Sequence, residues 1–365
     1  MKENAKKPGR IRAAILKWLG LPANYTDSAY GANSDAGIVI TQDKMLTISA
    51  VWACTRLISE TIATLPLSMY ERTSAGKRVA RDHPLQMIIH DQPNPHTTAA
   101  VHWEATVAAM LLRGNARSEK LMVGGRLVGL RFLHPDRLSC SLRSDGKREW
   151  RYVDSDGRQR IIPDSRIWNI PGFSLDGETG VSVVQYGANV FGGALAADMV
   201  ANKTFRNGLH PTVYFKYPTT LRAEQRQEAR EAIQKISGAL NSGAPAILEA
   251  GMEAGTIGIN PSDAQLLESR AFSVEEICRW FRVPPFMVGH SEKSTSWGTG
   301  IEQQMIGFLT FTLAPWLRRI EQAISKDLLT PAERLRYYPK FNVEGLLRAD
   351  SQARAEFYSS MVNNG

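Results

Sequence analysis

The chain has 365 residues, of which 43% are hydrophobic and 22% charged, and these globular proportions exclude a largely disordered protein. No run reaches the roughly 18 uninterrupted apolar residues of a membrane helix, so no membrane partner is predicted. The net charge is +8, but residues 1–20 carry six basic residues and one acid, which leaves +3 for residues 21–365. A body so close to neutral argues against tight binding of nucleic acid along its length, because such affinity needs many neutralised phosphates.

Residues 1–44 are predicted to form a flexible basic arm. The first 20 are either a frayed segment or a short amphipathic docking helix, with Ile11, Ile15 and Trp18 on one side. Lys17 interrupts the apolar run, so a secretory signal is not predicted. Residues 21–44 are rich in Gly, Ala, Asn, Ser and Asp and have no periodicity, which is typical of a loop.

Helical periodicity gives way to strand periodicity between residues 45 and 170. Apolar residues recur at helical spacing over 46–65, where Pro66 ends the helix, and a second helix is predicted over 99–112. The segment LPLSMYER that follows the first helix alternates as a strand. Residues 117–170 have period two with glycine turn signals, which predicts an antiparallel meander.

The segment DSDG, residues 154–157, lies within this meander. It could begin a calcium-binding loop, but the twelfth position of such a loop would be Ser165 instead of Glu. A hairpin turn is therefore the favoured interpretation.

A compact insert is predicted between two long helices. The first helix covers 181–205. The second begins at Ser262, and Ser273 with Glu276 repeats the capping-box spacing; it ends at Val283, just before two prolines. The insert has one polar helix and three short strands: a strand at 211–217, the helix at 221–237, and strands near 246–249 and 256–259.

The last predicted helix covers 301–329 and contains Pro315. Proline has no backbone N–H and crowds the carbonyl four residues earlier, which here belongs to Phe311. The sequence therefore predicts a kink in this helix at Pro315.

The motifs of common catalytic sites do not occur. There is no GxxxxGK[ST] phosphate loop, no HExxH and no GxSxG, so an ATP-driven motor, a zinc protease and a serine hydrolase are not predicted. Cys54, Cys140 and Cys278 are too far apart for a zinc site and odd in number, which is typical of a reducing cytoplasm. We predict no catalytic residue, metal or cofactor, with a magnesium-dependent nuclease built from distant carboxylates as a minor alternative.

Seven phrases follow one another in a fixed order. They are SAVWACTRLISETIATLPLSMYE (49–71), DHPL (82–85), QPNP (92–95), RGNA (113–116), FRNG (205–208), DAQLLESRAFSVEEICRWFRVPPFMVG (263–289) and IEQQ…FLTFTLAPWLRRIEQAI (301–324). Each phrase alone is a weak signal. In this order they resemble the portal proteins of tailed double-stranded DNA bacteriophages, in the branch with comparatively short chains.

The resemblance implies an α+β portal fold with a mixed wing domain, a two-helix stem, a small α/β clip insert, a tunnel loop and a long kinked helix. The implied boundaries are the basic arm (1–44), wing (45–180), first stem helix (181–208), clip (209–261), second stem helix (262–283), tunnel loop (284–300), kinked helix (301–329) and the start of a crown (330–365). Family members usually continue further with an acidic helix, so the crown is expected to be truncated, processed or omitted.

The resemblance also implies a non-enzymatic ring, expected to be a homododecamer, at the unique capsid vertex of the virion and assembled in the host cytoplasm. Its implied partners are double-stranded DNA in the channel, the terminase large subunit, the head–tail adaptor, and the major capsid or scaffold protein. The residues expected to contact DNA in the tunnel loop are Lys293, Ser294, Thr295, Ser296 and Trp297. The residues expected to bind partners in the clip are Lys216, Arg222, Arg226 and Arg230.

Two other classes of protein stay open on the sequence alone. One is a non-ring nucleic-acid-binding structural protein, which the near-neutral body disfavours and a steep salt dependence of DNA binding would support. The other is a hydrolase of unrecognised type, which the missing motifs disfavour. The arginines of the polar helix alternate with glutamates, which favours ion pairs within and between subunits over a DNA groove.

Overall fold

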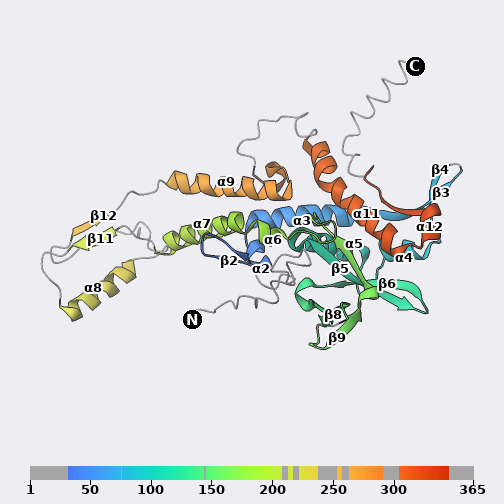
Figure 1. The fold of residues 1–365 in the computed structure, drawn as a ribbon. Coiled ribbons are helices and arrows are strands. Elements are labelled where there is room, and N and C mark those ends of the chain that lie inside the picture. The colour runs from blue at the N-terminus through green and yellow to red at the C-terminus, as the bar shows by residue number, and fades with distance from the viewer. Residues whose placement is uncertain are drawn as a thin grey trace, which may run out of the picture. The chain divides into compact units, whose positions relative to one another are not determined.

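The computed structural model describes residues 32–74, 76–143, 145–207, 213–216, 222–236, 253–256, 263–290 and 304–344. Helices and strands are mixed along the chain, and the contacts divide it into two compact units (Figure 1). The first unit holds Thr41–Gly187 and the chain from Cys278 onward. The second holds Asn33–Ile40 and Ala188–Ile277.

The first unit begins with the helices α2 (Gln42–Leu46), α3 (Ser49–Thr64), α4 (Pro84–His90) and α5 (Ala99–Arg113). The predicted helix ends are confirmed: Leu65 is already extended ahead of Pro66, and α5 stops at Gly114, whose φ of 77° is left-handed. Helices α3 and α5 pack against each other, and each buries an apolar face. These faces form the centre of the first unit's core.

Three antiparallel sheets of three strands each lie in the first unit, with the orders β10-β5-β6, β7-β8-β9 and β13-β3-β4. Their strands are β3 (Leu67–Thr73), β4 (Gly76–Val79), β5 (Asn115–Val123), β6 (Arg126–Leu133), β7 (Leu138–Leu142), β8 (Arg148–Val153), β9 (Gln159–Pro163), β10 (Ile167–Pro171) and β13 (Tyr337–Phe341).

The predicted single meander over 117–170 is instead divided between two sheets: the consecutive antiparallel pairings β5–β6 and β7–β8–β9 agree with the prediction, but they lie in different sheets. Strand β10 returns to pair with β5, because Trp168 and Ile170 are each 1% exposed and must be covered by the core. Trp168 packs edge-to-face on Trp103 of α5, with 6.3 Å between ring centroids. The DSDG hairpin prediction is confirmed, since this segment turns β8 into β9 with Gly157 at a φ of 82°.

The structure corrects the predicted flexible arm, because residues 32–44 are folded. Strands β1 (Ala32–Asn33) and β2 (Val39–Ile40) pair, and Thr41 caps α2 by accepting a hydrogen bond from the Lys44 N–H at 3.3 Å. Ile40 and Met45 are both 0% exposed. These buried apolar residues anchor the segment. The polar residues around them made the segment read as a flexible loop in the sequence.

The structure also corrects the expected start of a crown at residue 330. Helix α12 (Pro331–Arg336) and β13 belong to the first unit, where β13 pairs with β3. The Glu71 carboxylate on β3 pairs with both Arg78 and Arg336, and the Phe341 N–H donates to the buried Glu321 carboxylate at 3.0 Å. Residues 331–341 are therefore part of the same folded body as residues 67–79.

The second unit contains α7 (Ala188–Asn207), β11 (Val213–Lys216), α8 (Ala223–Ile236), β12 (Glu253–Thr256) and the first part of α9 (Asp263–Phe281). The single helix predicted over 181–205 is two helices in the structure: α6 (Val183–Tyr186) ends at Gly187, and α7 begins at the next residue. Strand β12 pairs with β11 three residues earlier than the strand predicted at 256–259, and the strand predicted near 246–249 lies outside the described residues. Ser273 lies inside α9, so its capping-box spacing starts no new helix.

Candidate functional site

The chain enters the predicted tunnel loop from the end of α9. Arg282 follows this helix with a φ of 55°, and among the described residues other than glycine it alone has a positive φ. The Arg282 N–H donates to the Arg279 carbonyl at 3.2 Å and the Val283 N–H to the Cys278 carbonyl at 2.9 Å, the pattern of a Schellman cap. A side chain in this left-handed conformation costs about 1–2 kcal/mol, so other contacts must hold Arg282 there.

The prolines after Arg282 direct the chain away from α9. Pro284 is extended, and the short 3-10 helix η4 (Pro285–Val288) follows and packs against α3. The helix η4 ends at Gly289, whose φ is 82°, and the His290 N–H donates to the Pro285 carbonyl at 3.1 Å. This flank of the loop is therefore fixed as far as His290.

The chain leaves the predicted loop through an irregular helix. The π-helix η5 (Phe308–Leu313) runs directly into α11 (Ala314–Leu328), and the Ala314 N–H donates to the Leu309 carbonyl five residues earlier. Pro315 follows at once and cannot donate to the Phe311 carbonyl. The wider π turn is a local response to this missing donor. The bend predicted at Pro315 stays a prediction.

Thr312 joins the two flanks. Its hydroxyl donates to the Arg282 carbonyl at 2.5 Å, and its side chain is 4% exposed. A hydrogen bond of this kind contributes about 1 kcal/mol, similar to the cost of the left-handed Arg282. We call Arg282, η4, η5 and Thr312 the loop frame, because the Thr312 hydrogen bond links the segment before the predicted loop to the segment after it.

Cysteines connect α9 to α3 beside the loop frame. The sulfurs of Cys54 and Cys278 are 4.0 Å apart, and both residues are buried. The hydrogen bond with Cys278 and then burial raise the pKa of the Cys54 thiol far above its ordinary value. The contact is therefore between neutral thiols, which pack as small apolar groups and are poor nucleophiles.

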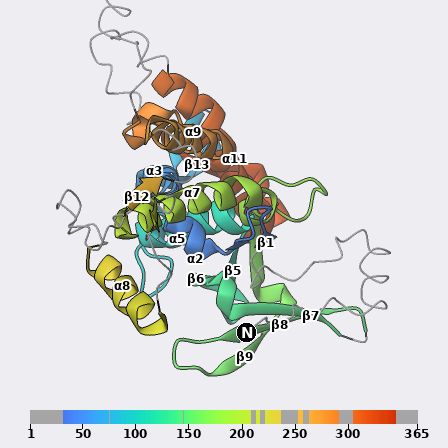
Figure 2. The ribbon, with the colours of Figure 1, turned by 90° about the vertical axis from the view of Figure 1, so that its left-hand side faces the viewer.

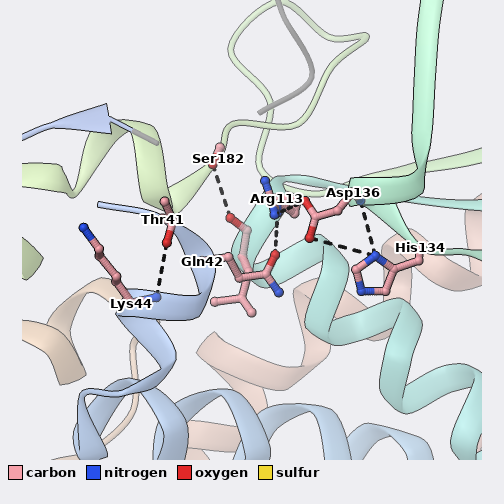
Figure 3. A network of polar contacts seen from close by, with 8 residues as sticks. Thr41, Gln42, Lys44, Arg113, His134, Asp136 and Ser182 are labelled. Atoms are coloured by element: carbon pink, nitrogen blue, oxygen red, sulfur yellow. Dashed lines mark hydrogen bonds and ion pairs between the residues drawn. The ribbon is translucent and has the colours of Figure 1, made fainter. Parts of the chain in front are cut away.

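The polar network of Figure 3 is a second fixed point of the first unit. The Arg113 guanidinium at the end of α5 donates to the side chains of Gln42 and Asp136, and the Ser182 hydroxyl donates to the Leu112 carbonyl at 3.2 Å. His134 lies beside Asp136, and its Nδ1 accepts the Asp136 N–H at 3.3 Å. These contacts tie α2, α5 and the start of α6 together and leave no arrangement of nucleophile and base.

In the described part of the chain, no three His, Cys, Asp or Glu side chains lie close enough together to hold a metal ion. None of its helices combines the length and apolar character needed to cross a membrane. The loop frame links the described segments that precede and follow the predicted tunnel loop, and this geometry suits holding a loop in place.

The sequence-predicted site residues fall into two groups. Lys293, Ser294, Thr295, Ser296 and Trp297 lie outside the described residues, between the two flanks of the loop frame. Lys216 is on β11, where its ammonium lies 3.6 Å from the Glu253 carboxylate, and Arg222, Arg226 and Arg230 are at the start of α8 or within it.

Sequence reasoning missed Arg282 and Thr312. Pro315 was the available signal for an irregular helix, but the spacing rules for a proline kink do not distinguish a π turn from a bend. A left-handed arginine has no sequence signature, because glycine is the usual residue in that position.

A family model described as "Phage portal protein" matches residues 49–365. The chain belongs to the phage portal protein family. The portal protein of Enterobacteria phage HK97 is 33% identical over 343 residues, which cover 93% of this chain and 80% of that protein. The probable portal protein of Streptomyces phage phiC31 is 35% identical over 358 residues, covering 93% of this chain and 77% of that protein.

Solved structures share this portal fold. An HK97 family phage portal protein from Corynebacterium diphtheriae matches with a TM-score of 0.62 and 18% identity, over 86% of this chain and 99% of that one. A chain in the neck of a native gene transfer agent particle, computed with C12 symmetry, matches with a TM-score of 0.59 and 23% identity. That match covers 95% of this chain and 93% of the other. At these identities the likeness establishes the fold alone.

Proposed function

We propose that this portal protein forms a closed ring at the unique capsid vertex, through which double-stranded DNA is packaged and ejected, and which joins the head to the tail. Family membership over residues 49–365 carries this proposal. The loop frame supports it, because a loop that must stay at the wall of a channel needs both of its ends fixed. The ring itself has no catalytic residue, and the energy for DNA movement comes from a separate ATPase.

The proposed parts of the subunit follow the boundaries implied by the sequence, with one change. The wing covers 45–180, the stem helices 181–208 and 262–283, the clip 209–261, the tunnel loop 284–300 and the kinked helix 301–329. The pairing of β13 with β3 supports adding residues 331–341 to the wing, so that any crown begins after Phe341. We extend twelvefold symmetry to this ring from the C12 neck particle.

Repetition gives the tunnel loop its proposed effect on DNA. Residues 291–300 contain several hydroxyl side chains, and Lys293 is balanced by Glu292. One such loop binds phosphates feebly, but a ring brings many copies to the same DNA, and weak contacts are multiplied. Lys293 is the proposed phosphate contact, with Ser294, Thr295 and Ser296 as hydrogen-bond donors, and Trp297 narrows the channel.

The clip is the proposed contact for the packaging and tail machinery. Lys216 and the α8 residues Arg222, Arg226 and Arg230 would meet the terminase large subunit and then the head–tail adaptor. The described side chains of Arg222 and Arg226 are exposed, which supports their availability to another protein or subunit. The wing is the proposed contact for the major capsid or scaffold protein, and assembly takes place in the host cytoplasm.

The Lys293→Glu substitution tests the role of the tunnel loop. It should change the length or retention of packaged DNA in purified particles and leave the ring intact, because Lys293 is the proposed phosphate contact in the channel. Lys326→Glu is the matched control, since Lys326 is 80% exposed on α11. If the Lys293 variant packages and retains DNA as the control does, the loop assignment is wrong.

A non-ring nucleic-acid-binding protein is the alternative. It predicts that the isolated chain binds DNA with a steep dependence on salt concentration, because each neutralised phosphate releases counterions. The ring proposal predicts weak binding by a single chain.

A further inference from the structure

A loop in the first unit is held more firmly than a surface connection requires. Residues 173–179, which we call the acidic loop, leave β10 and return to α6. At their base the Gly172 N–H donates to the Gly114 carbonyl at 2.7 Å, and the Val181 N–H donates to the Phe173 carbonyl at 2.6 Å. A Cβ added to Gly180 would lie 1.6 Å from the Gly114 carbonyl oxygen, so no side chain fits at this crossing. We call Gly114, Gly172 and Gly180 the glycine mount.

The interior of the acidic loop is also ordered. The Asp176 carboxylate accepts the N–H groups of Glu178 at 2.8 Å and Thr179 at 2.7 Å, together with the hydroxyls of Ser174 and Thr179. Hydrogen bonds with Thr179, its side chain first, keep the pKa of Asp176 well below its usual range. From α11, the Arg319 guanidinium donates to the Gly172 carbonyl at 2.7 Å and so braces the base.

This rigid loop presents apolar side chains to solvent. Phe173 is 59% exposed and Leu175 is 69% exposed, and the loop contains Asp176 and Glu178 but no basic residue. In Figure 2 the yellow-green loop extends from the body beside α11. Ordering a loop costs conformational entropy, and displaying large apolar groups on it lowers solubility. Both features are expected of a surface that another protein covers.

A surface of the opposite kind lies at the far end of the same sheet. Residues 120–131, which we call the basic hairpin tip, join β5 to β6 and contain Lys120, Arg126 and Arg131 but no acid. Val123 is 66% exposed and Val128 is 52% exposed. None of the three basic side chains pairs with a carboxylate of the described residues.

The sheet register separates these surfaces. Pro171, where the acidic loop begins, pairs with Asn115 at the start of β5, and the basic hairpin tip lies at the other end of that strand. A strand of nine residues spans roughly 26 Å at ~3.3 Å per residue, so the two surfaces of one copy do not cover each other. A closed ring needs a head-to-tail contact between two different surfaces of the same chain.

We propose that the acidic loop of one subunit docks on the basic hairpin tip of a neighbouring copy of this chain. Phe173 and Leu175 would pack on Val123 and Val128, while Glu178 faces Arg126. The choice of a second copy rests on the opposite charges of the two surfaces and on the proposed ring.

Engineered disulfides test the contact directly in the full chain. Cys140 is exposed, so the parent carries Cys140→Ser, and Leu175→Cys is combined with Val123→Cys. Mild oxidation of the assembled protein should give a ladder of covalent multimers on a non-reducing denaturing gel. Each single variant, and the pair Leu175→Cys with Leu335→Cys on α12, should give monomers. Rings of the double variant that yield no ladder would overturn the proposal.

Charge reversal provides a second readout. Glu178→Arg and Arg126→Glu should each weaken assembly about tenfold by placing like charges together, and the double variant should restore it. Mass measurement of the Cys140→Ser parent distinguishes a failure of the proposed ring from a failure of the proposed contact. If the parent forms no ring, the proposed function fails; if it forms rings that neither test affects, only this contact fails.

Discussion

The loop frame and the glycine mount are two ways of holding a loop. The loop frame uses a left-handed Arg282, a π-helix and one hydrogen bond from Thr312, so it contains backbone strain that a small contact offsets. In the glycine mount, the backbones at Gly114 and Gly180 cross so closely that a Cβ at Gly180 would collide with the Gly114 carbonyl. The comparison indicates that the glycine mount tolerates no added side chain, whereas the loop frame depends on one hydrogen bond whose loss would cost about 1–2 kcal/mol.

Gly180→Ala should have the largest effect on stability. Its Cβ would lie 1.6 Å from the Gly114 carbonyl oxygen, and a backbone contact cannot be relieved by rotating a side chain. We expect a loss of at least about 3 kcal/mol in the free energy of unfolding, or failure to fold, measured by denaturant titration. Gly193→Ala is the control, because Gly193 has open space in α7 and should gain up to about 1 kcal/mol. Equal free energies of unfolding for the two variants would contradict the close contact between Gly180 and the Gly114 carbonyl.

His102 should give the free energy of unfolding of the protein a dependence on pH. It lies in α5, the helix that ends at Gly114, and burial lowers the pKa of His102 to about 4. Below pH ~6.5 the unfolded chain binds a proton that the folded chain excludes, so stability falls as pH drops from 6.5 to 4, by about 3 kcal/mol in total. Above pH 6.5 this contribution is constant.

The His102→Leu variant removes the titrating group. Its free energy of unfolding should change less between pH 6.5 and 4 than that of the unsubstituted protein, by about the same 3 kcal/mol. Parallel pH profiles of the two proteins would show that His102 is not buried as a neutral side chain.

Thr312→Val should loosen the loop frame at a moderate cost. The substitution keeps the shape of the side chain but leaves the Arg282 carbonyl without its donor, which we expect to cost about 1–2 kcal/mol. Thr312→Ser keeps the hydroxyl and serves as the control. If hydrogen exchange of the His290 amide is the same in both variants, the hydrogen bond does not hold the flanks together.

Arg282→Gly should have the smallest effect, and with the opposite sign. Glycine adopts a φ of 55° without steric cost, so we expect a gain of about 1 kcal/mol. The same change at Arg279, inside α9, should lose about 1 kcal/mol because glycine disfavours a helix interior. Destabilisation by Arg282→Gly would mean that the arginine side chain, and not the backbone, determines this corner.

The sequence predicted the parts of the fold that local chemistry determines. Pro66 and Gly114 marked the ends of α3 and α5, and the DSDG turn and the polar helix of the insert were found from spacing alone. The sequence did not predict the pairing of β10 with β5 or of β13 with β3. These strands are far apart in the sequence, and their pairing depends on which apolar side chains are buried together, which local sequence patterns do not indicate. The same reason explains why residues 32–44 and 331–341 were assigned to separate segments.

The candidate site was predicted only in part. The prolines after Val283 marked the end of α9 and Pro315 marked an irregular helix, while the loop between them was placed by the resemblance to portal proteins. Arg282 and Thr312 were missed because a left-handed backbone and a long-range hydrogen bond have no sequence pattern. The residues expected to touch DNA came from the resemblance to portal proteins and stay predictions. The ion pairs predicted for the interleaved charges of α8 stay a prediction; the Lys216–Glu253 pair joins β11 to β12 and does not involve that helix.

Mass measurement of the purified full-length protein in solution, by native mass spectrometry or mass photometry, tests the central claim most directly. The account predicts one dominant closed assembly, at about twelve times the mass of the chain, that persists on dilution. A dominant single chain, or a dimer that does not grow with concentration, would contradict it.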